Sequence, residues 1–144
     1  MKLLRFIPAL ACIVACTPQE MPTPSRSALF ETHPKRLFEA FETSCSGPGK
    51  VFEKIGEQAF ECSEYLPPKA AAYLILNYDG FPQDLPQSVM RLTSSKTGSG
   101  YRVDTRSYFK VPQKSGLIVE VPLESDTLDQ AISSLYRAMG GTPT

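Results

Sequence analysis

The chain has very few of the residues on which the commonest catalytic and metal sites depend. It contains a single histidine, His33, and no tryptophan. A nucleophile is usually activated by histidine, and a zinc site needs several histidine or cysteine ligands at short spacing. We therefore expect no catalytic residues, no metal site and no cofactor, and expect that the protein is not an enzyme. His33 precedes Pro34 at an expected helix start, so we interpret it as a solvent-exposed or capping residue.

Sequence motifs of other enzymes are also missing. The chain has no Gly-x-Ser-x-Gly turn, which excludes the nucleophile elbow of the α/β-hydrolases. The "GSG" at residues 98–100 lacks the rest of a nucleotide-binding fingerprint and is simpler to interpret as a hairpin turn. Asp79, Asp104 and Glu120 are scattered acids, not an evident carboxylate pair for glycoside hydrolysis. An uncharacterised hydrolase stays only as a further alternative.

The chain has no excess of positive charge. Fifteen basic and fifteen acidic residues balance, and no basic run or patch is visible. Nucleic-acid-binding domains usually carry such a patch. We therefore expect no nucleic-acid partner.

The chain also has no apolar run long enough to cross a bilayer as a helix. The N-terminal run spans residues 6–15, whereas a transmembrane helix needs about 20 apolar residues. Lys2 and Arg5 precede this run, which gives the charge pattern of a secretory signal. Residues 13–16 read Ile-Val-Ala-Cys and resemble the lipobox of bacterial lipoproteins. The alternatives are an ordinary signal cut after Ala11 and an uncleaved anchor.

The lipobox resemblance implies a sorting class and no activity. It implies cleavage before Cys16, acylation of that residue with diacylglycerol and palmitate-type chains, and attachment to membrane lipid. Thr17, in place of aspartate, resembles an outer-membrane address facing the periplasm. Removal of residues 1–15 would leave thirteen basic against fifteen acidic residues, a net charge of −2. We expect a proline-rich disordered spacer over residues 16–31 and one small domain over residues 32–144.

The lipoprotein interpretation accounts for all four cysteines. Cys12 lies in the signal and Cys16 would carry lipid. Cys45 and Cys62 are left, seventeen positions apart, in a compartment where disulfides persist. Their spacing matches neither a zinc motif nor a Cys-x-x-Cys redox pair. We predict a structural disulfide between them.

The remaining pattern predicts an α+β domain. Apolar residues three and four apart predict a C-terminal helix over residues 127–139, with Thr127 as its cap, and a first helix starting near Thr32. Alternating segments between them predict four or five mostly antiparallel strands, with both helices on one face. Residues 70–78 fit either a helix or a buried strand. We choose the strand, because it would form a simple hairpin with residues 87–94.

Polar residues along one expected strand suggest a docking face. Arg102, Asp104, Arg106 and Tyr108 occupy every second position, on the side opposite Val103. The simplest interpretation is a solvated strand face, and the functional one is a site for another envelope protein. The whole sequence therefore favours a lipid-anchored, non-enzymatic envelope module for binding or assembly. The competing hypothesis is a small inhibitor or immunity protein against a cell-wall hydrolase, with residues 94–100 or 80–86 as the inserting loop.

Overall fold

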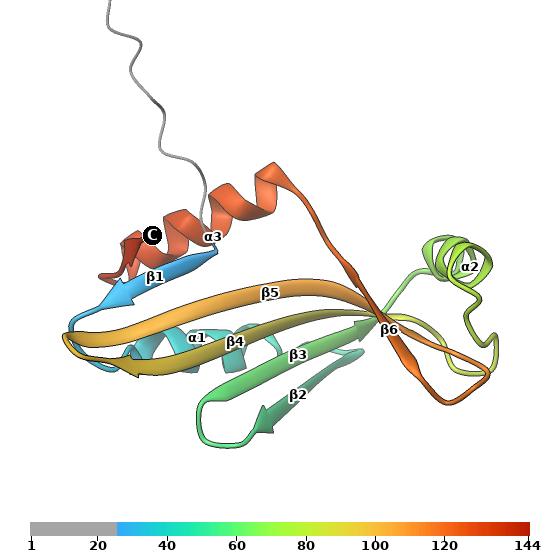
Figure 1. Ribbon diagram of the computed structural model, residues 1–144, viewed down its shortest axis with the longest axis horizontal. Coiled ribbons are helices and arrows are strands. Elements are labelled where there is room, and N and C mark those ends of the chain that lie inside the picture. The colour runs from blue at the N-terminus through green and yellow to red at the C-terminus, as the bar shows by residue number, and fades with distance from the viewer. Residues whose placement is uncertain (1–25) are drawn as a thin grey trace, which may run out of the picture.

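The computed structural model describes residues 26–144. The expected signal peptide, the lipidated Cys16 and the first part of the spacer lie outside these residues. Three helices and seven strands follow one another along the described chain (Figure 1). In order they are β1 Ser27–Phe30, α1 Lys35–Ser44, β2 Lys50–Ile55, β3 Ala59–Tyr65, α2 Pro68–Asn77, β4 Gln87–Thr97, β5 Gly100–Pro112, β6 Ile118–Pro122, α3 Asp126–Ala138 and β7 Thr142–Pro143.

The strands form one antiparallel sheet built around β5. The main path runs β2-β3-β4-β5-β1-β7, and β6 pairs with β5 off this path. One edge of β5 pairs with β4 from Gly100 to Lys110, while the other edge is shared by β1 near the start of β5 and by β6 near its end. The prediction of four or five strands was too low. The four residues of β1 and the two of β7 are too short to show a period, and β1 lies within the stretch that we assigned to the disordered spacer.

The C-terminal helix agrees with its predicted apolar stripe, although its cap differs. α3 begins at Asp126, and the hydroxyl of Ser125, not that of Thr127, accepts a hydrogen bond from the backbone N–H of Leu128. A serine at this position satisfies one of the free N–H groups of the first turn. Arg137 lies in the last turn, where a cation interacts favourably with the helix dipole.

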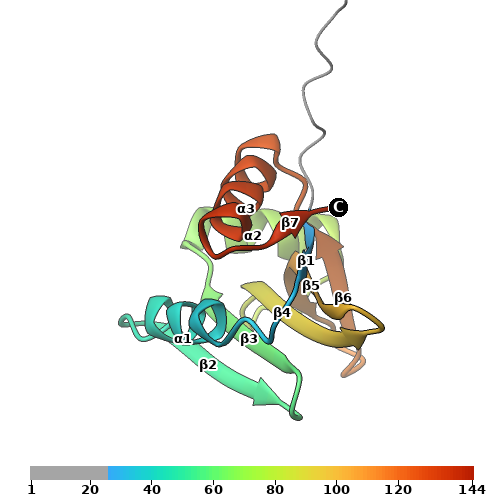
Figure 2. The same cartoon turned by 90° about the vertical axis from the view of Figure 1, so that its left-hand side faces the viewer.

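The two outer helices contribute to one core. Figure 2 shows α1 and α3 as two separate helices, with α3 above α1. Their apolar stripes and the strands share a single cluster of buried side chains. Its members are Ala28, Phe30, Leu37, Phe38, Phe41, Leu92, Val103, Ile132 and Tyr136.

The segment that we assigned to a central strand is the helix α2, so that prediction was wrong. Pro68 stands in the first turn, where its missing N–H costs nothing, and the three alanines that follow favour a helix. Ala71 and Leu74 are buried, three residues apart, as one helix face requires. The strand that pairs with β4 is instead β3, with Tyr65 opposite Gln87.

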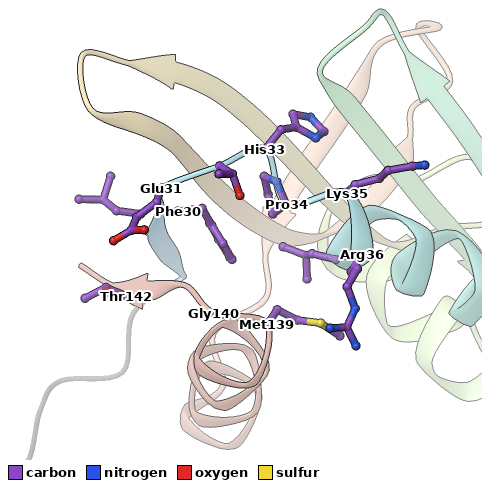
Figure 3. Close-up of a pocket in the computed structure, with 12 residues that line it drawn as sticks. Phe30, Glu31, His33, Pro34, Lys35, Arg36, Met139, Gly140 and Thr142 are labelled. Atoms are coloured by element: carbon purple, nitrogen blue, oxygen red, sulfur yellow. The ribbon is translucent and has the colours of Figure 1, made fainter.

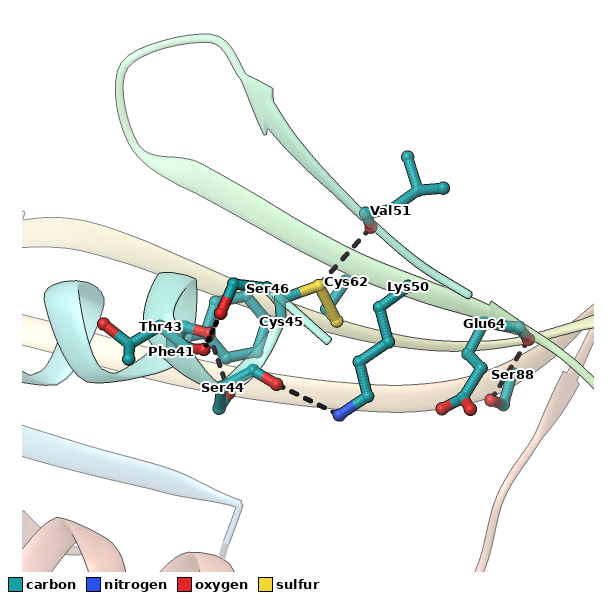
Figure 4. Close-up of a disulfide and its surroundings, with 10 residues drawn as sticks. All are labelled: Phe41, Thr43, Ser44, Cys45, Ser46, Lys50, Val51, Cys62, Glu64 and Ser88. Carbon is teal, nitrogen blue, oxygen red and sulfur yellow. Dashed lines mark hydrogen bonds between the residues drawn. A yellow bond between two sulfur atoms is a disulfide. The ribbon is translucent and has the colours of Figure 1, made fainter. Parts of the chain in front are cut away.

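The predicted disulfide is present and joins α1 to the sheet (Figure 4). Cys45 follows the last residue of α1 and Cys62 lies in β3, with 5.8 Å between their Cα atoms. The Sγ of Cys45 also lies 3.5 Å from the carbonyl oxygen of Val51. A sulfur in a disulfide has no proton to donate, so this is a packing contact.

Candidate functional site

All four expected docking residues lie on the sheet face opposite the helices, and three of them are accessible there. Alternation along β5 places Arg102, Asp104 and Arg106 on this face, each partly or fully exposed. Each is already paired. Arg102 Nε lies 2.9 Å from Asp104 Oδ1, and Arg106 Nη2 lies 2.9 Å from Glu120 Oε2 across the β5–β6 ladder.

The fourth, Tyr108, is buried and cannot serve as an exposed anchor. Only 3% of its surface is accessible. Its hydroxyl donates a hydrogen bond of 3.2 Å to Glu61 Oε2, and the guanidinium groups of Arg91 and Arg106 lie over its ring, 5.6 and 5.4 Å from the centroid. Burial, with the negative charge of Glu61 as a smaller cause, raises the pKa of Tyr108 to about 12.

The partner of Tyr108 belongs to an ion pair that the sequence analysis missed. Glu61 in β3 is 6% exposed and faces Arg91 in β4 in the strand register. Arg91 donates to Glu61 Oε2 through Nε at 2.7 Å and Nη2 at 2.5 Å. The one sequence signal for this pair was the alternation in "FECSE", which sets Glu61 on the side opposite Phe60 and Cys62. Only the strand register then places Arg91 beside Glu61, on the same face as Tyr108. This cluster is internally satisfied, and we interpret it as structural.

A more accessible site lies on the other face of the sheet, where residues of α1, α3, β4 and β5 come together. A cavity of about 210 Å³ opens there, and its lining is almost wholly apolar. Leu37 and Phe41 of α1 line one side, Ile132 and Leu135 of α3 line the other, and Met90 of β4 is part of the floor. Leu135 is 43% exposed, although it belongs to this lining. We call this cavity and its neighbour, described next, the helix groove.

The second cavity of the helix groove is more polar. It has a volume of about 290 Å³ and shares Phe41, Ser44 and Met90 with the first. Lys50, Glu64 and Ser88 border it, as Figure 4 shows beside the disulfide. Lys50 Nζ donates to the carbonyl oxygen of Ser44 at 3.0 Å.

One buried hydroxyl in the second cavity has no partner. Ser107 in β5 lines this cavity and is 5% exposed, yet its Oγ makes no hydrogen bond to any described residue. Buried hydroxyls are normally hydrogen-bonded, because leaving one unsatisfied costs about 1–3 kcal/mol. The helix groove thus combines an apolar part with a free hydrogen-bonding group.

A third cavity, of about 350 Å³, borders the connection between β1 and α1 (Figure 3). His33 is exposed there; its ring centroid lies 5.5 Å from that of Phe38 and 5.1 Å from that of Tyr101. The predicted exposure of His33 is thus confirmed, whereas the helix cap is Pro34. The basic side chains of Lys35 and Arg36 border this cavity.

Within residues 26–144, no three His, Cys, Asp or Glu side chains gather closely enough to hold a metal ion. No helix of this part of the chain has the length and apolarity needed to cross a membrane. Comparison with known proteins finds no matching family model, no matching curated protein and no matching solved structure.

Proposed function

We propose that this protein is a lipid-anchored, periplasm-facing envelope lipoprotein of the outer membrane, and that it acts as a non-enzymatic binding module. The anchor is the acylated Cys16, and the ligand is an apolar segment of another envelope protein, which enters the helix groove. The observation that carries the binding role is the helix groove itself, with its apolar lining and its unpartnered Ser107 hydroxyl.

Two further observations favour the helix groove over the opposite sheet face. The charges of Arg102, Arg106 and Arg91 are already paired within the domain, so a partner docking on that face would have to compete with those pairs. An apolar side chain entering the helix groove breaks no ion pair and removes apolar surface from water, which stabilises a complex by about 25 cal/mol per Å² before the costs of association.

The anchor is tested by lipid labelling. The wild-type protein should incorporate labelled palmitate and be found in the membrane fraction. The Cys16→Ser protein should lose the label and be found unprocessed or soluble. Membrane retention of a mature-sized, unlabelled Cys16→Ser protein would show that another feature holds the protein there.

The binding role is tested by site-specific photo-crosslinking in intact cells. A cross-linker in place of Leu135, inside the helix groove, should capture one defined envelope protein, whereas one in place of Ile55 on β2 should not. Both residues are similarly exposed, at 43% and 44%. An Ala40→Phe substitution, which fills the apolar cavity, should abolish the Leu135 product. Equal products from both positions would refute the proposal. A product formed only from residues 94–100, with a cell-wall hydrolase as the partner, would favour the inhibitor hypothesis.

A further inference from the structure

The helix α2 is unusually apolar for a helix on a protein surface. Its sequence, PKAAAYLILN, carries one charged residue, Lys69. Only Ala71 and Leu74 are buried, while Tyr73 is 64% exposed and Leu76 is 83% exposed. A helix that is apolar on all sides is normally buried in a core or in a membrane. The solvent side of α2 is thus suited to another apolar surface.

This apolar surface continues onto the turn between β5 and β6. Leu117 in this turn is 71% exposed, and Ile118, the first residue of β6, is 52% exposed. The turn lies against the end of α2, because Gln113 Nε2 donates a hydrogen bond of 2.9 Å to the carbonyl oxygen of Tyr78. Figure 1 shows α2 and this turn together at one end of the molecule, away from α1 and α3. We call these exposed residues the tip patch: Tyr73, Leu76, Tyr78, Leu117 and Ile118.

The charges beside the tip patch suit an anionic, interfacial environment. Lys69 lies at the start of α2 and Lys114 lies in the β5–β6 turn, so each belongs to a segment that carries part of the tip patch, and Asp79 follows α2. Lysine side chains can lie along an apolar surface while their ammonium groups reach polar headgroups. Such groups are attracted to anionic lipids. Tyrosine is enriched at the level of the headgroups for a similar reason.

We propose that the tip patch rests in the interfacial region of the membrane that carries the lipid anchor. This inference relies on the proposed acylation of Cys16. Ten residues lead from Cys16 to Arg26, and an extended proline-rich segment of that length spans about 31 Å at 3.1 Å per residue. A domain of this size has a radius of gyration of about 13 Å, so the tether is long enough for the tip patch to reach the bilayer. Tethering also raises the local concentration, so a weakly binding patch suffices.

The absence of tryptophan permits a direct test. The full-length lipidated protein with the substitution Tyr73→Trp is reconstituted in phosphatidylglycerol-containing vesicles whose acyl chains carry bromine, which quenches tryptophan on contact. We expect a blue-shifted emission and quenching several-fold stronger than for a matched Ile55→Trp protein, whose probe lies on β2. The further substitution Leu76→Asp or Leu117→Asp should remove the quenching. Equal quenching of the two probes, or none for Tyr73→Trp, would overturn the proposal.

The same probe separates the tip patch from the anchor. Blue-shifted emission of Tyr73→Trp without bromine quenching would indicate burial against protein and would overturn the membrane assignment. If the lipidated Tyr73→Trp protein shows the emission of a solvent-exposed tryptophan, membrane contact of the tip patch is refuted, while the proposed acylation of Cys16 is unaffected. The Cys16→Ser, Tyr73→Trp protein tests the patch without the anchor. If it binds these vesicles, and if Lys69→Gln together with Lys114→Gln weakens this binding severalfold, the tip patch contacts the membrane independently of acylation.

Discussion

Replacing Arg91 by methionine tests the interpretation of the buried charge cluster. The substitution keeps an apolar stem of similar length and removes the guanidinium that donates twice to Glu61 Oε2. Glu61 has a side chain that is 8% exposed. In the Arg91→Met protein its only remaining side-chain donor in the cluster is the hydroxyl of Tyr108, at 3.2 Å. A buried carboxylate would then have lost its countercharge.

The expected loss of stability follows from this burial. Removing one partner of a buried ion pair typically costs about 3–5 kcal/mol. We expect the lower end, about 3 kcal/mol, because the side chain of Arg91 is 28% exposed and water can partly replace it. For a domain of this size, each kcal/mol lowers the melting temperature by about 4 °C, so the decrease should be about 12 °C. Calorimetry or denaturant titration measures it.

A matched control separates burial from charge. Arg102→Met removes a guanidinium from the same sheet face, but its pair with Asp104 is 48% and 39% exposed. We expect less than about 1 kcal/mol there. The double substitution Glu61→Gln with Arg91→Met should cost at least about 1 kcal/mol less than the sum of the two single changes. Equal losses for Arg91→Met and Arg102→Met, or strict additivity in the cycle, would refute the reasoning.

Three further predictions concern the stability of the domain. Cys62→Ala should lower the free energy of unfolding by about 3 kcal/mol, the chain entropy of a loop of this size, and an unchanged denaturation midpoint relative to the oxidised protein would contradict it. Gly100→Ala should cost about 1–3 kcal/mol, because a Cβ there would collide with a backbone carbonyl oxygen at the end of β1; Gly98→Ala in the same hairpin meets open space and should change the melting temperature far less. Burial raises the pKa of both Tyr108 and Tyr136 to about 12, against about 10 in an unfolded chain. The stability that depends on their protonated form should therefore be intact below about pH 10 and fall as the pH rises through 12; denaturant titrations that show the same decline in Tyr108→Phe would exclude Tyr108 as a cause.

The sequence predicted those parts of the fold that rest on repeated local signals. The stripe in α3 extends over several turns, and the cysteine pair was selected by elimination, so both could be found without coordinates. The strand β1, Ser27–Phe30, could not be predicted, because four residues are too few to show a period. Its strand conformation depends on pairing with β5, which is distant in the sequence. The choice at α2 failed because a short apolar run suits a strand and a helix equally well, and the local preference of the alanines decided it.

The candidate site was harder to predict for a related reason. Alternation correctly placed Arg102, Asp104 and Arg106 on one face, but it cannot tell a free charge from a paired one. The partner Glu120 lies across the β5–β6 ladder and Glu61 lies two strands from β5, so the pairing depends on register. The helix groove depends in addition on how two helices lie over the sheet, which no short stretch of sequence encodes.

Binding of a partner should depend on salt differently at the charged sheet face and at the apolar helix groove. Contacts between exposed charges weaken as ionic strength rises, since the Debye length falls from about 10 Å at 0.1 M to about 3 Å at 1 M. Apolar contacts in a groove do not depend on this screening. If a partner occupies the helix groove, the yield of the Leu135 cross-link in isolated envelopes should stay nearly constant from low to high sodium chloride. A yield that falls steeply with salt, together with cross-linking from Arg102, would place the partner on the opposite face of the sheet.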